Sequence, residues 1–285
     1  MLQVMLTIKT VSFFMFTIVI GLAQLSHAIL GGYTIPTDGV YLTPQAQFNL
    51  ASHVVGLVDT GNPSTHSICS AVLIAPNIAL TAAHCVVKAE TANLFIVADD
   101  ATFAVFSRHT VSRVLIHPNY NPKNSIIPTL DAPTYDLALI KFDGIMPERF
   151  SAVPLLKPST DRFNIWPVVA GYGYTSREKM DVGILRFTLL KVNSYILKQN
   201  YFYADQTNGL GICNGDSGGP VFMTRAADFV LIGITSASAA YNPYIAGALG
   251  KDNCTGTSMF SNVLFYKNWI DQGLIELNKT QPNRI

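Results

Sequence analysis

Short runs of β-branched and aromatic residues recur along the chain, and they limit its possible folds more than any other feature. Segments rich in Pro, Gly, Asn and Asp separate these runs and favour turns. Many short strands at such spacing are typical of β-barrels and β-sandwiches. The runs cover residues 53–58, 70–83, 94–98, 111–116, 137–142, 166–173, 185–192, 220–223 and 229–236.

One segment has a different periodicity. From Val263 to Asn278, apolar residues recur at helical spacing, which predicts an amphipathic helix. Gly273 weakens this helix, so that a break there is open. The chain has 285 residues, 49% of them hydrophobic, which fits one large all-β unit or two compact domains. A Pro-containing polar segment, 146–162, is the best candidate for a linker between two halves.

Residues 1–28 are similar to a secretory signal. Lys9 gives a short positive start, an apolar stretch runs over 11–23, and a small-residue cleavage site ends at Ala28. The alternative is an uncleaved membrane anchor, but the apolar stretch is shorter than the roughly 20 residues needed to span a bilayer. We therefore expect a secreted, periplasmic or extracellular protein with no stable membrane association after the signal is removed.

Charge and cysteine content limit the ligands and partners that the protein is expected to bind. Lys and Arg number 19 and Asp and Glu 18, so no charged field favours nucleic acid or anionic lipid. Four cysteines in an exported chain favour two disulfides, and the residues alone leave three pairings open. They are Cys69, Cys85, Cys213 and Cys254. Neither CxxC nor HxxxH spacing occurs, and the acidic pair Asp99 and Asp100 is expected to be solvated, so no metal or cofactor is predicted.

The motif "CNGDSGGP", residues 213–220, carries the sharpest chemical signal. Glycines on both sides of an Asp-Ser pair let the backbone turn tightly and expose Ser217. They also let the N–H groups of Gly215 and Ser217 point the same way, as an oxyanion hole requires. A Gly-rich turn with an incidental serine is the alternative. The pattern favours a nucleophilic serine.

A nucleophilic serine needs a base and a carboxylate to orient that base. His84 ends the apolar run of "LTAAHC" and directly precedes Cys85, and a bridge from Cys69 to Cys85 would clamp this turn. Asp136 begins the apolar run of "DLALIKF". An aspartate before a strand is usually a turn residue. Asp136 is therefore a candidate for the carboxylate only because Ser217 and His84 are also present. The remaining histidines are expected to be ordinary surface or core residues, and His27 leaves with the signal.

Together these motifs resemble the chymotrypsin/trypsin-like serine endopeptidases, nearly end to end after residue 28. The order His, Asp, Ser is that family's order. The matching pieces are "ILGG" at 29–32, "CSAVLIAPNIALTAAHC" at 69–85, "YDLALIKF" at 135–142, "GYG" at 171–173, "CNGDSGGP" at 213–220, "GITS" at 233–236 and "FSNVLFYKNWI" at 260–270.

The resemblance implies an all-β fold of two six-stranded antiparallel β-barrels with a C-terminal α-helix. The first barrel, 29–155, would carry His84 and Asp136, and the second, 156–285, would carry Ser217 and the specificity pocket. It further implies disulfides between Cys69 and Cys85 and between Cys213 and Cys254. Protein or peptide substrates, a proteinaceous inhibitor as a further partner, and a monomer are expected.

By the same resemblance, Ser236 hydrogen-bonds near Asp136 and, with Ala237 and Ser238, receives the substrate backbone as an added strand. Gly211 forms the floor of the primary pocket, which disfavours Lys and Arg, and Ile212 makes the pocket more apolar. Ser238 and Ser258 narrow its walls. The expected cleavage therefore follows apolar residues of medium or moderately large size. An insertion over 239–253 lies at the pocket rim, either solvated or in contact with substrate.

The resemblance also gives the chain start a role. The family buries a free amine against the acid before the nucleophile, which here pairs Ile29 with Asp216. Cleavage after Ala28 would release Ile29 directly, so we expect a protease that is active on export. The alternative is an earlier cut that leaves a propeptide of residues 24–28.

Two other functions fit the same residues. An inactive serine-protease homologue would keep the fold as a binding module, although such proteins typically lose a residue of the triad. An esterase or acyltransferase would use the same triad on another substrate. The complete set of His84, Asp136, Ser217 and Gly215 favours an active endopeptidase.

Overall fold

The first half of the chain forms a closed barrel of six antiparallel strands, in the order β2-β3-β4-β7-β6-β5. The computed structural model describes residues 33–34, 44–61, 67–98, 107–122, 135–157, 166–175, 181–194, 200–225, 228–239 and 254–279. The strands are β2 Val54–Asp59, β3 Ser67–Ala75, β4 Ile78–Thr81, β5 Leu94–Ala98, β6 Ser107–Ile116 and β7 Ala138–Phe142. Short 3₁₀ turns, η1 Ala83–Cys85 and η2 Thr91–Asn93, follow β4 and precede β5.

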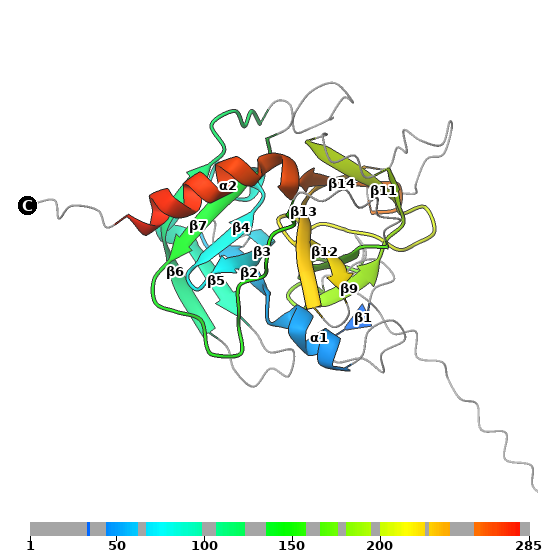
Figure 1. The fold of residues 1–285 in the computed structure, drawn as a ribbon, viewed down its shortest axis with the longest axis horizontal. Coiled ribbons are helices and arrows are strands. Elements are labelled where there is room, and N and C mark those ends of the chain that lie inside the picture. The colour runs from blue at the N-terminus through cyan, green and yellow to red at the C-terminus, as the bar shows by residue number, and fades with distance from the viewer. Residues whose placement is uncertain are drawn as a thin grey trace, which may run out of the picture.

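The second half forms a sheet that has eight strands within the described residues, in the order β1-β9-β8-β12-β13-β14-β11-β10. The two outermost strands are short, and six longer strands lie between them. The bounds are β1 Tyr33–Thr34, β8 Val168–Gly171, β9 Arg186–Leu189, β10 Val192–Ser194, β11 Tyr201–Asp205, β12 Pro220–Arg225, β13 Asp228–Ala239 and β14 Thr257–Asn262. The expected chymotrypsin-like fold class is confirmed, with one closed barrel and this second sheet beside it (Figure 1).

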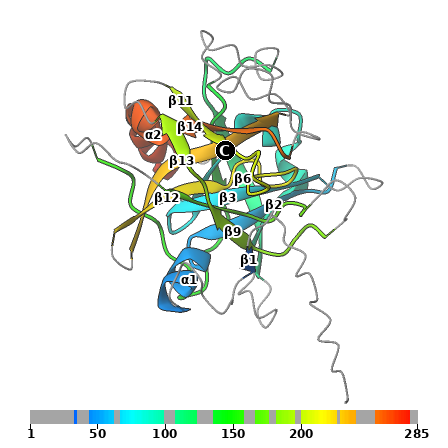
Figure 2. The same ribbon diagram turned by 90° about the vertical axis from the view of Figure 1, so that its right-hand side faces the viewer.

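Two α-helices lie outside the strands. Helix α1, Pro44–Ala51, precedes the barrel, and helix α2, Val263–Asn278, follows β14 and crosses over β6 and β7 (Figures 1 and 2). The Asn262 side chain accepts a hydrogen bond from the Leu264 N–H and so caps the start of α2. Within the described part of the chain, no helix is both long and apolar enough to cross a membrane.

Both faces of several barrel strands are buried, which explains why the sequence shows continuous apolar runs. In β4, Ala79 points into the barrel core, whereas Ile78 and Leu80 join a second cluster. That second cluster lies between the barrel, the second sheet and α2, and it includes Phe222 and Ile270. Strands that are covered on both sides lose the alternation of polar and apolar residues.

The segment expected to be a linker touches both halves over its described residues, 146–157. The Val153 N–H donates to the Leu73 carbonyl of β3, at 2.9 Å. The Leu156 N–H donates to the Leu231 carbonyl of β13, at 3.0 Å. The chain therefore crosses between the two β units here.

Helix α2 has the predicted bounds, but the break that Gly273 allows does not occur. The helix continues through Gly273 because this residue lies directly against β7. A Cβ atom at this position would come closer than 3.0 Å to the buried Leu139 side chain and would press on Leu115. The glycine therefore permits close packing of the helix on the barrel.

We predict that Gly273→Ala destabilises the protein. The gain in helix propensity is about 1 kcal/mol, whereas overpacking of a core typically costs roughly 1–3 kcal/mol. Chemical denaturation should therefore show a net loss of about 1 kcal/mol. Gln272→Ala, at the exposed neighbouring position, is the control and should be nearly neutral. An increase in stability for Gly273→Ala would contradict the packing role.

Candidate active site

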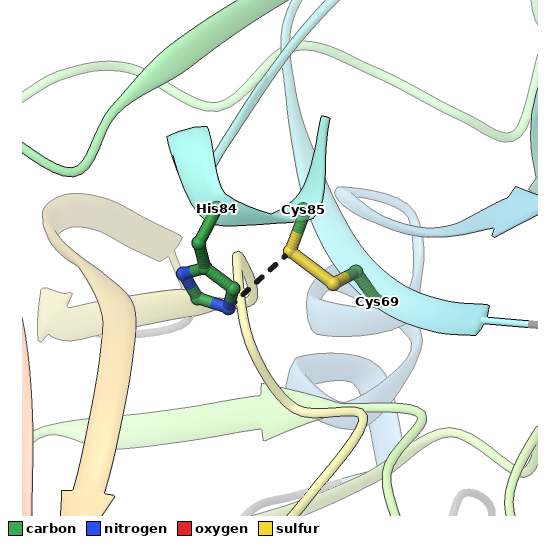
Figure 3. Close-up of side chains that lie close together, drawn as sticks. All are labelled: Cys69, His84 and Cys85. Atoms are coloured by element: carbon green, nitrogen blue, oxygen red, sulfur yellow. Dashed lines mark hydrogen bonds between the residues drawn. A yellow bond between two sulfur atoms is a disulfide. The ribbon is translucent and has the colours of Figure 1, made fainter. Parts of the chain in front are cut away.

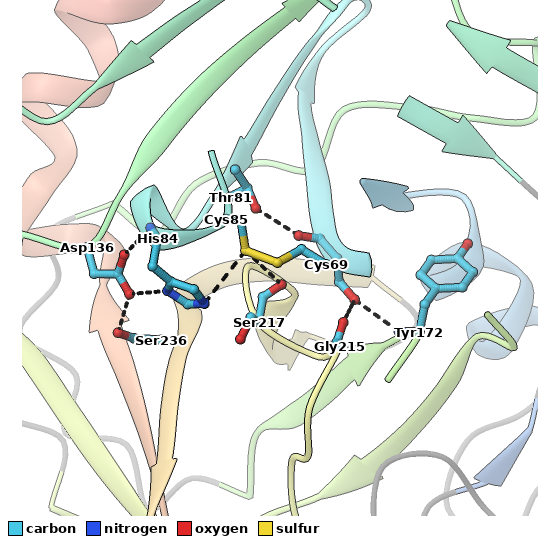
Figure 4. Close-up of a disulfide and its surroundings, with 10 residues drawn as sticks. Cys69, Thr81, His84, Cys85, Asp136, Tyr172, Gly215, Ser217 and Ser236 are labelled. Carbon is cyan, nitrogen blue, oxygen red and sulfur yellow. Dashed lines mark hydrogen bonds and ion pairs between the residues drawn. A yellow bond between two sulfur atoms is a disulfide. The ribbon is translucent and has the colours of Figure 1, made fainter. Parts of the chain in front are cut away.

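His84 and Asp136 meet where the barrel faces the second sheet. His84 lies in η1 directly after β4, and Asp136 lies just before β7, which pairs with β4. The Asp136 carboxylate accepts the His84 backbone N–H at 2.9 Å and contacts the ring Nδ1 at 2.8 Å. The Ser236 hydroxyl, from β13 of the second sheet, donates to the same carboxylate at 2.6 Å (Figure 4). The carboxylate is thus fully buried and held by donors from both halves.

This arrangement changes the acid-base behaviour of His84. Burial alone lowers the pKa of the imidazole, but the charge of Asp136 and its hydrogen bond together outweigh burial, so the pKa is raised above 6.5. Since Asp136 holds Nδ1 as a donor, the neutral ring keeps Nε2 as its proton acceptor. The structure thus pairs an oriented base with a buried carboxylate.

The backbone before Asp136 is in an unusual conformation. Tyr135 has a positive φ of 45°, which is rare for a residue other than glycine. Its ring stacks on His117 with centroids 4.8 Å apart and meets Tyr266 edge-on at 5.9 Å. The Tyr135 carbonyl accepts the Leu137 N–H at 2.8 Å, closing a tight turn around Asp136. Aromatic packing therefore stabilises the turn that presents the carboxylate.

Ser217 lies in a tight loop that two glycines shape. Gly215 and Gly218 have positive φ values of 93° and 79°, which glycine adopts without strain. The Gly218 N–H and the Gly219 N–H both have backbone acceptors. By contrast, among the residues that the structure describes, the N–H groups of Gly215 and Ser217 have no acceptor. Two unpaired N–H groups beside the half-buried Ser217 are what a developing oxyanion requires.

Ser217 lies beside His84, but no hydrogen bond joins the Ser217 hydroxyl to the His84 ring. Instead, His84 Nε2 lies 3.7 Å from the sulfur of Cys85 (Figure 3). The Ser217 carbonyl lies at the same distance from this sulfur (Figure 4). Catalytic hydrogen bonds are often long in free enzymes and tighten when substrate binds.

Both disulfides that the resemblance implies are present. Cys69 is joined to Cys85 and Cys213 to Cys254, with sequence separations of 16 and 41. The first disulfide holds the turn that carries His84 onto β3. The second joins the loop that carries Ser217 to the segment before β14. Cys69, Cys85 and His84 are the one group in the described part of the chain whose ligand atoms could surround a metal ion. Both sulfur atoms are bonded in the disulfide, so this group offers no thiolate.

Asp216 is fully buried directly before Ser217. Its carboxylate accepts the N–H groups of Gly173 and Cys213, each at 2.8 Å. Burial raises the pKa of Asp216 to about 7, against these two hydrogen bonds and the positive charge of Arg186. The expected partner, Ile29, lies outside the described residues. β1 pairs with β9 and places the chain after Ile29 next to the strand that carries Arg186.

Ser70 of β3 connects the barrel to the nucleophile loop. Its N–H donates to the Ser217 carbonyl at 2.7 Å, and its hydroxyl donates to the Gly215 carbonyl at 3.0 Å. The same hydroxyl accepts the Tyr172 N–H at 3.0 Å, and the Ser70 carbonyl accepts the Thr81 hydroxyl at 2.8 Å. Nothing in the sequence around Ser70 indicated this role, since serine is common in strands of any kind.

A cavity of about 270 Å³ opens beside these residues. Its lining combines the predicted catalytic and substrate-binding groups with Asn214, which the sequence did not suggest. The lining residues are His84, Ile212, Cys213, Asn214, Ser217, Ser236, Ala237 and Ser238. Gly211 and Ser258, which were expected in the pocket, are not part of this lining. The insertion over 239–253 lies outside the described residues, apart from the backbone of Ala239.

The other described histidines lie away from this cavity. His53 contacts the Ser151 carbonyl through Nδ1 at 2.8 Å, and His109 contacts the Asp143 carbonyl at 3.0 Å. His117 belongs to the aromatic packing around Tyr135. His66, like Asp99 and Asp100, lies outside the described residues. None of these three described histidines is hydrogen-bonded to Ser217.

Comparisons with known proteins agree with this geometry. Residues 43–270, which make up most of the chain, match the family model described as Trypsin. The chain therefore belongs to the chymotrypsin/trypsin-like serine protease family. A match to half of the chain or more is specific to the family rather than to one short motif.

Several curated relatives share this family. The chain is 29% identical to "Venom serine protease 34" of Apis mellifera, over 63% of the chain and 48% of the relative. It is 25% identical to "Atrial natriuretic peptide-converting enzyme" of Mus musculus, over 74% of the chain and 19% of the relative. It is also 29% identical to "Collagenase" of Hypoderma lineatum, over 80% of the chain and 84% of the relative. The chain thus spans about half of the first relative and about a fifth of the second.

We predict that Ser70→Ala weakens the contact between the two halves. The change leaves the Tyr172 N–H and the Gly215 carbonyl without their partner, and a buried unpaired group costs about 1–3 kcal/mol. Chemical denaturation should show a loss in this range. Ser112→Ala, whose hydroxyl is bonded on the exposed side of β6, is the matched control. If both variants unfold alike, Ser70 does not hold the halves together.

Proposed function

We propose that this protein is a secreted serine endopeptidase that hydrolyses peptide bonds through an acyl-enzyme. Ser217 is the nucleophile, and His84 takes its proton and later donates it to the leaving amine. Asp136 keeps the imidazole in the correct tautomer and stabilises its positive charge. The observation that carries this proposal is the buried Asp136, bonded to His84 and Ser236, beside a serine flanked by two unpaired N–H groups.

The N–H groups of Gly215 and Ser217 hold the oxyanion that forms when Ser217 attacks. Loss of one such donor typically costs about 3–4 kcal/mol of transition-state stabilisation. Gly215 supports this role because its N–H has no acceptor among the described residues and its positive φ is one that glycine adopts without strain. A side chain there would also lie closer than 3.0 Å to the backbone of Gly173.

The substrate backbone binds along β13. Pairing between β12 and β13 ends at Ile234, whereas β14 continues to pair with β13 as far as Ala239. Ser236 to Ser238 therefore have a strand on one side, and the other side faces the cavity. An extended peptide can add there as a further strand. The side chain before the cleaved bond then enters the cavity beside Ile212, which favours apolar residues over Lys and Arg.

Two alternative functions make different predictions. An inactive homologue would bind partners without reacting, and an esterase would cleave esters but not amides. The complete constellation of His84, Asp136, Ser217 and the unpaired N–H groups favours an active enzyme. The edge of β13 beside the cavity favours peptides.

Reaction with a fluorophosphonate probe tests the proposal directly. We expect covalent labelling of Ser217 in the native protein and none in Ser217→Ala or after heat denaturation. Hydrolysis of a denatured protein digest should accompany it, with amide as well as ester turnover. A folded protein that is not labelled would be a binding module, and one that turns over esters alone would be an esterase.

Asp136→Asn should reduce kcat/KM by roughly 10⁴-fold and change its dependence on pH. The charge and the hydrogen bond of Asp136 raise the pKa of His84, whereas burial lowers it. Without the carboxylate, only the effect of burial on the pKa of His84 remains, and burial lowers that pKa. The acidic limb of the kcat/KM profile should therefore move to lower pH. Asp271→Asn, on the outer face of α2, is the control. If the acidic limb of the profile does not move, a group other than His84 controls it.

We further propose that the amine of Ile29, released by cleavage after Ala28, pairs with Asp216. The carboxylate is buried with two N–H donors, and ionisation without a nearby cation is unfavourable. Such a pair would hold the loop that carries Gly215 and Ser217. Amino-terminal sequencing of the exported Ser217→Ala protein should give Ile29 as the first residue. A start at residue 24 would instead indicate a propeptide.

A protein with one extra alanine before Ile29 should lose stability as the pH rises. Without the paired amine, the pKa of Asp216 is about 7 instead of 3.8, so the folded state binds a proton that the unfolded state has released. Stability then falls between about pH 4 and pH 7, by roughly 4 kcal/mol. The form that begins at Ile29 should resist this loss until its amine deprotonates near pH 8.

Thermal unfolding of both forms, each carrying Ser217→Ala, measures this difference from pH 4 to pH 9. Introducing Asp216→Asn into both forms is the control and should remove the difference. Coincident profiles of the two original forms would contradict the pairing of Ile29 with Asp216.

A further inference from the structure

Gln206 lies behind Ile212, one of the residues that line the cavity, at a position that the sequence did not single out. It follows β11 directly and is fully buried. Its backbone N–H donates to the Gly256 carbonyl at 3.0 Å, which fixes the residue beside the chain that enters β14. A fully buried glutamine needs partners for its amide group, so its contacts define what it does.

The Gln206 amide joins Ile212, which lines the cavity, to Ser258 of β14, which lies behind the lining. Its Oε1 accepts the Ile212 N–H at 3.0 Å and also the hydroxyl of Ser258. Its Nε2 donates to the Ile212 carbonyl at 3.4 Å. The side chain is thus held between the segment that leads to Ser217 and strand β14. These bonds keep it in one orientation.

Gly211 shows which space the Gln206 side chain fills. A Cβ atom built on Gly211 would come closer than 3.0 Å to the Cβ, Cδ and Oε1 atoms of Gln206. Any side chain at residue 211 would therefore point into the volume that Gln206 occupies. Consistent with this, the cavity is lined by Ile212 and Ser238 but not by Gly211 or Ser258.

We infer that Gln206 forms the floor of the pocket and makes the pocket shallow. The inference rests on the proposed peptidase function and names the substrate side chain that this site takes. The amide is neutral, and its oxygen already accepts two hydrogen bonds, so it offers no counter-charge to Lys or Arg. The side chain before the cleaved bond is small and aliphatic, as in Ala or Val, and aromatic side chains are too long. The family resemblance suggested apolar residues of medium or moderately large size before the cleaved bond, and Gln206 restricts this preference to smaller side chains.

Peptide substrates that differ in one residue, the one before the cleaved bond, test this inference. We expect kcat/KM for Ala and Val to exceed kcat/KM for Phe by at least about tenfold in the native protein. Gln206→Ala removes the floor, and the Phe-to-Ala ratio of kcat/KM should rise by about tenfold or more. Gln206→Met keeps the volume without the hydrogen bonds, so it should retain the native preference.

The same variants also distinguish a change in the depth of the pocket from a general disruption of the site. Fluorophosphonate labelling of Ser217 in Gln206→Met and Gln206→Ala shows whether the site of each variant is formed, and the kcat/KM ratios are compared between labelled proteins. A native preference for Phe would overturn the inference, as would a Gln206→Ala protein that labels normally but keeps the small-residue preference. Absence of labelling and of hydrolysis in the native protein would instead refute the peptidase function.

A stability measurement tests the contact without relying on activity. Gly211→Ala should lower the melting temperature, because the new Cβ meets the Gln206 side chain. In the Gln206→Ala background, the same change at Gly211 should lower it by clearly less. Equal effects in the two backgrounds would show that Gln206 does not fill the space above Gly211.

Discussion

The site depends on hydrogen bonds that cross between the barrel and the second sheet. Ser70 of the barrel binds the carbonyls of Ser217 and Gly215, which belong to the second half. In the opposite direction, Ser236 of the second half binds Asp136 of the first. Neither unit could set the distance between His84 and Ser217 by itself. The apolar cluster between the units keeps water from these bonds and so strengthens them.

Burial of charge is the second physical theme. Asp136 and Asp216 are both fully buried, but their surroundings differ. Asp136 has a side-chain donor on each side, and one of these donors, His84, can carry a positive charge. Asp216 has two backbone N–H groups and the more distant Arg186. The first arrangement suits a carboxylate that orients a neighbouring imidazole, and the second suits one that responds to an added cation.

Local patterns in the sequence predicted much of the fold. The apolar runs matched β2 to β9, β12 and β13. Several of these strands, such as β4 and β8, are buried on both faces, which leaves a strong signal even in a short strand. Strands β11 and β14 escaped notice, since "YFYAD" and "TSMFSN" mix polar and apolar residues. Helix α1 was missed because its apolar periodicity is weak, and the continuity of α2 through Gly273 depends on a contact with β7 that lies far away in sequence.

Some residues of the candidate site could likewise be predicted from local sequence, and others could not. The motif around Ser217 has its own backbone requirements, so glycines and an acid reveal it locally. Ser70 bonds to Tyr172 and Gly215, which are 102 and 145 positions away, and Gln206 bonds to Ile212 and Ser258, which are 6 and 52 positions away. Nothing in their sequence neighbours indicates these contacts. Gln206 also lies in a polar stretch after β11 that is typical of a surface turn. The family resemblance pointed to Gly211 but could not show what lies behind a glycine.

Strand β13 couples two tasks that are often treated as independent. Ser236 holds Asp136, and the next two residues line the cavity that we propose receives substrate. A ligand too bulky for the cavity would push on the same strand that anchors the carboxylate, and a misaligned anchor would slow proton transfer. Selectivity would then emerge partly as a turnover defect for oversized ligands rather than purely as weaker binding. Efforts to widen this cavity would have to preserve the strand's alignment as well as create room.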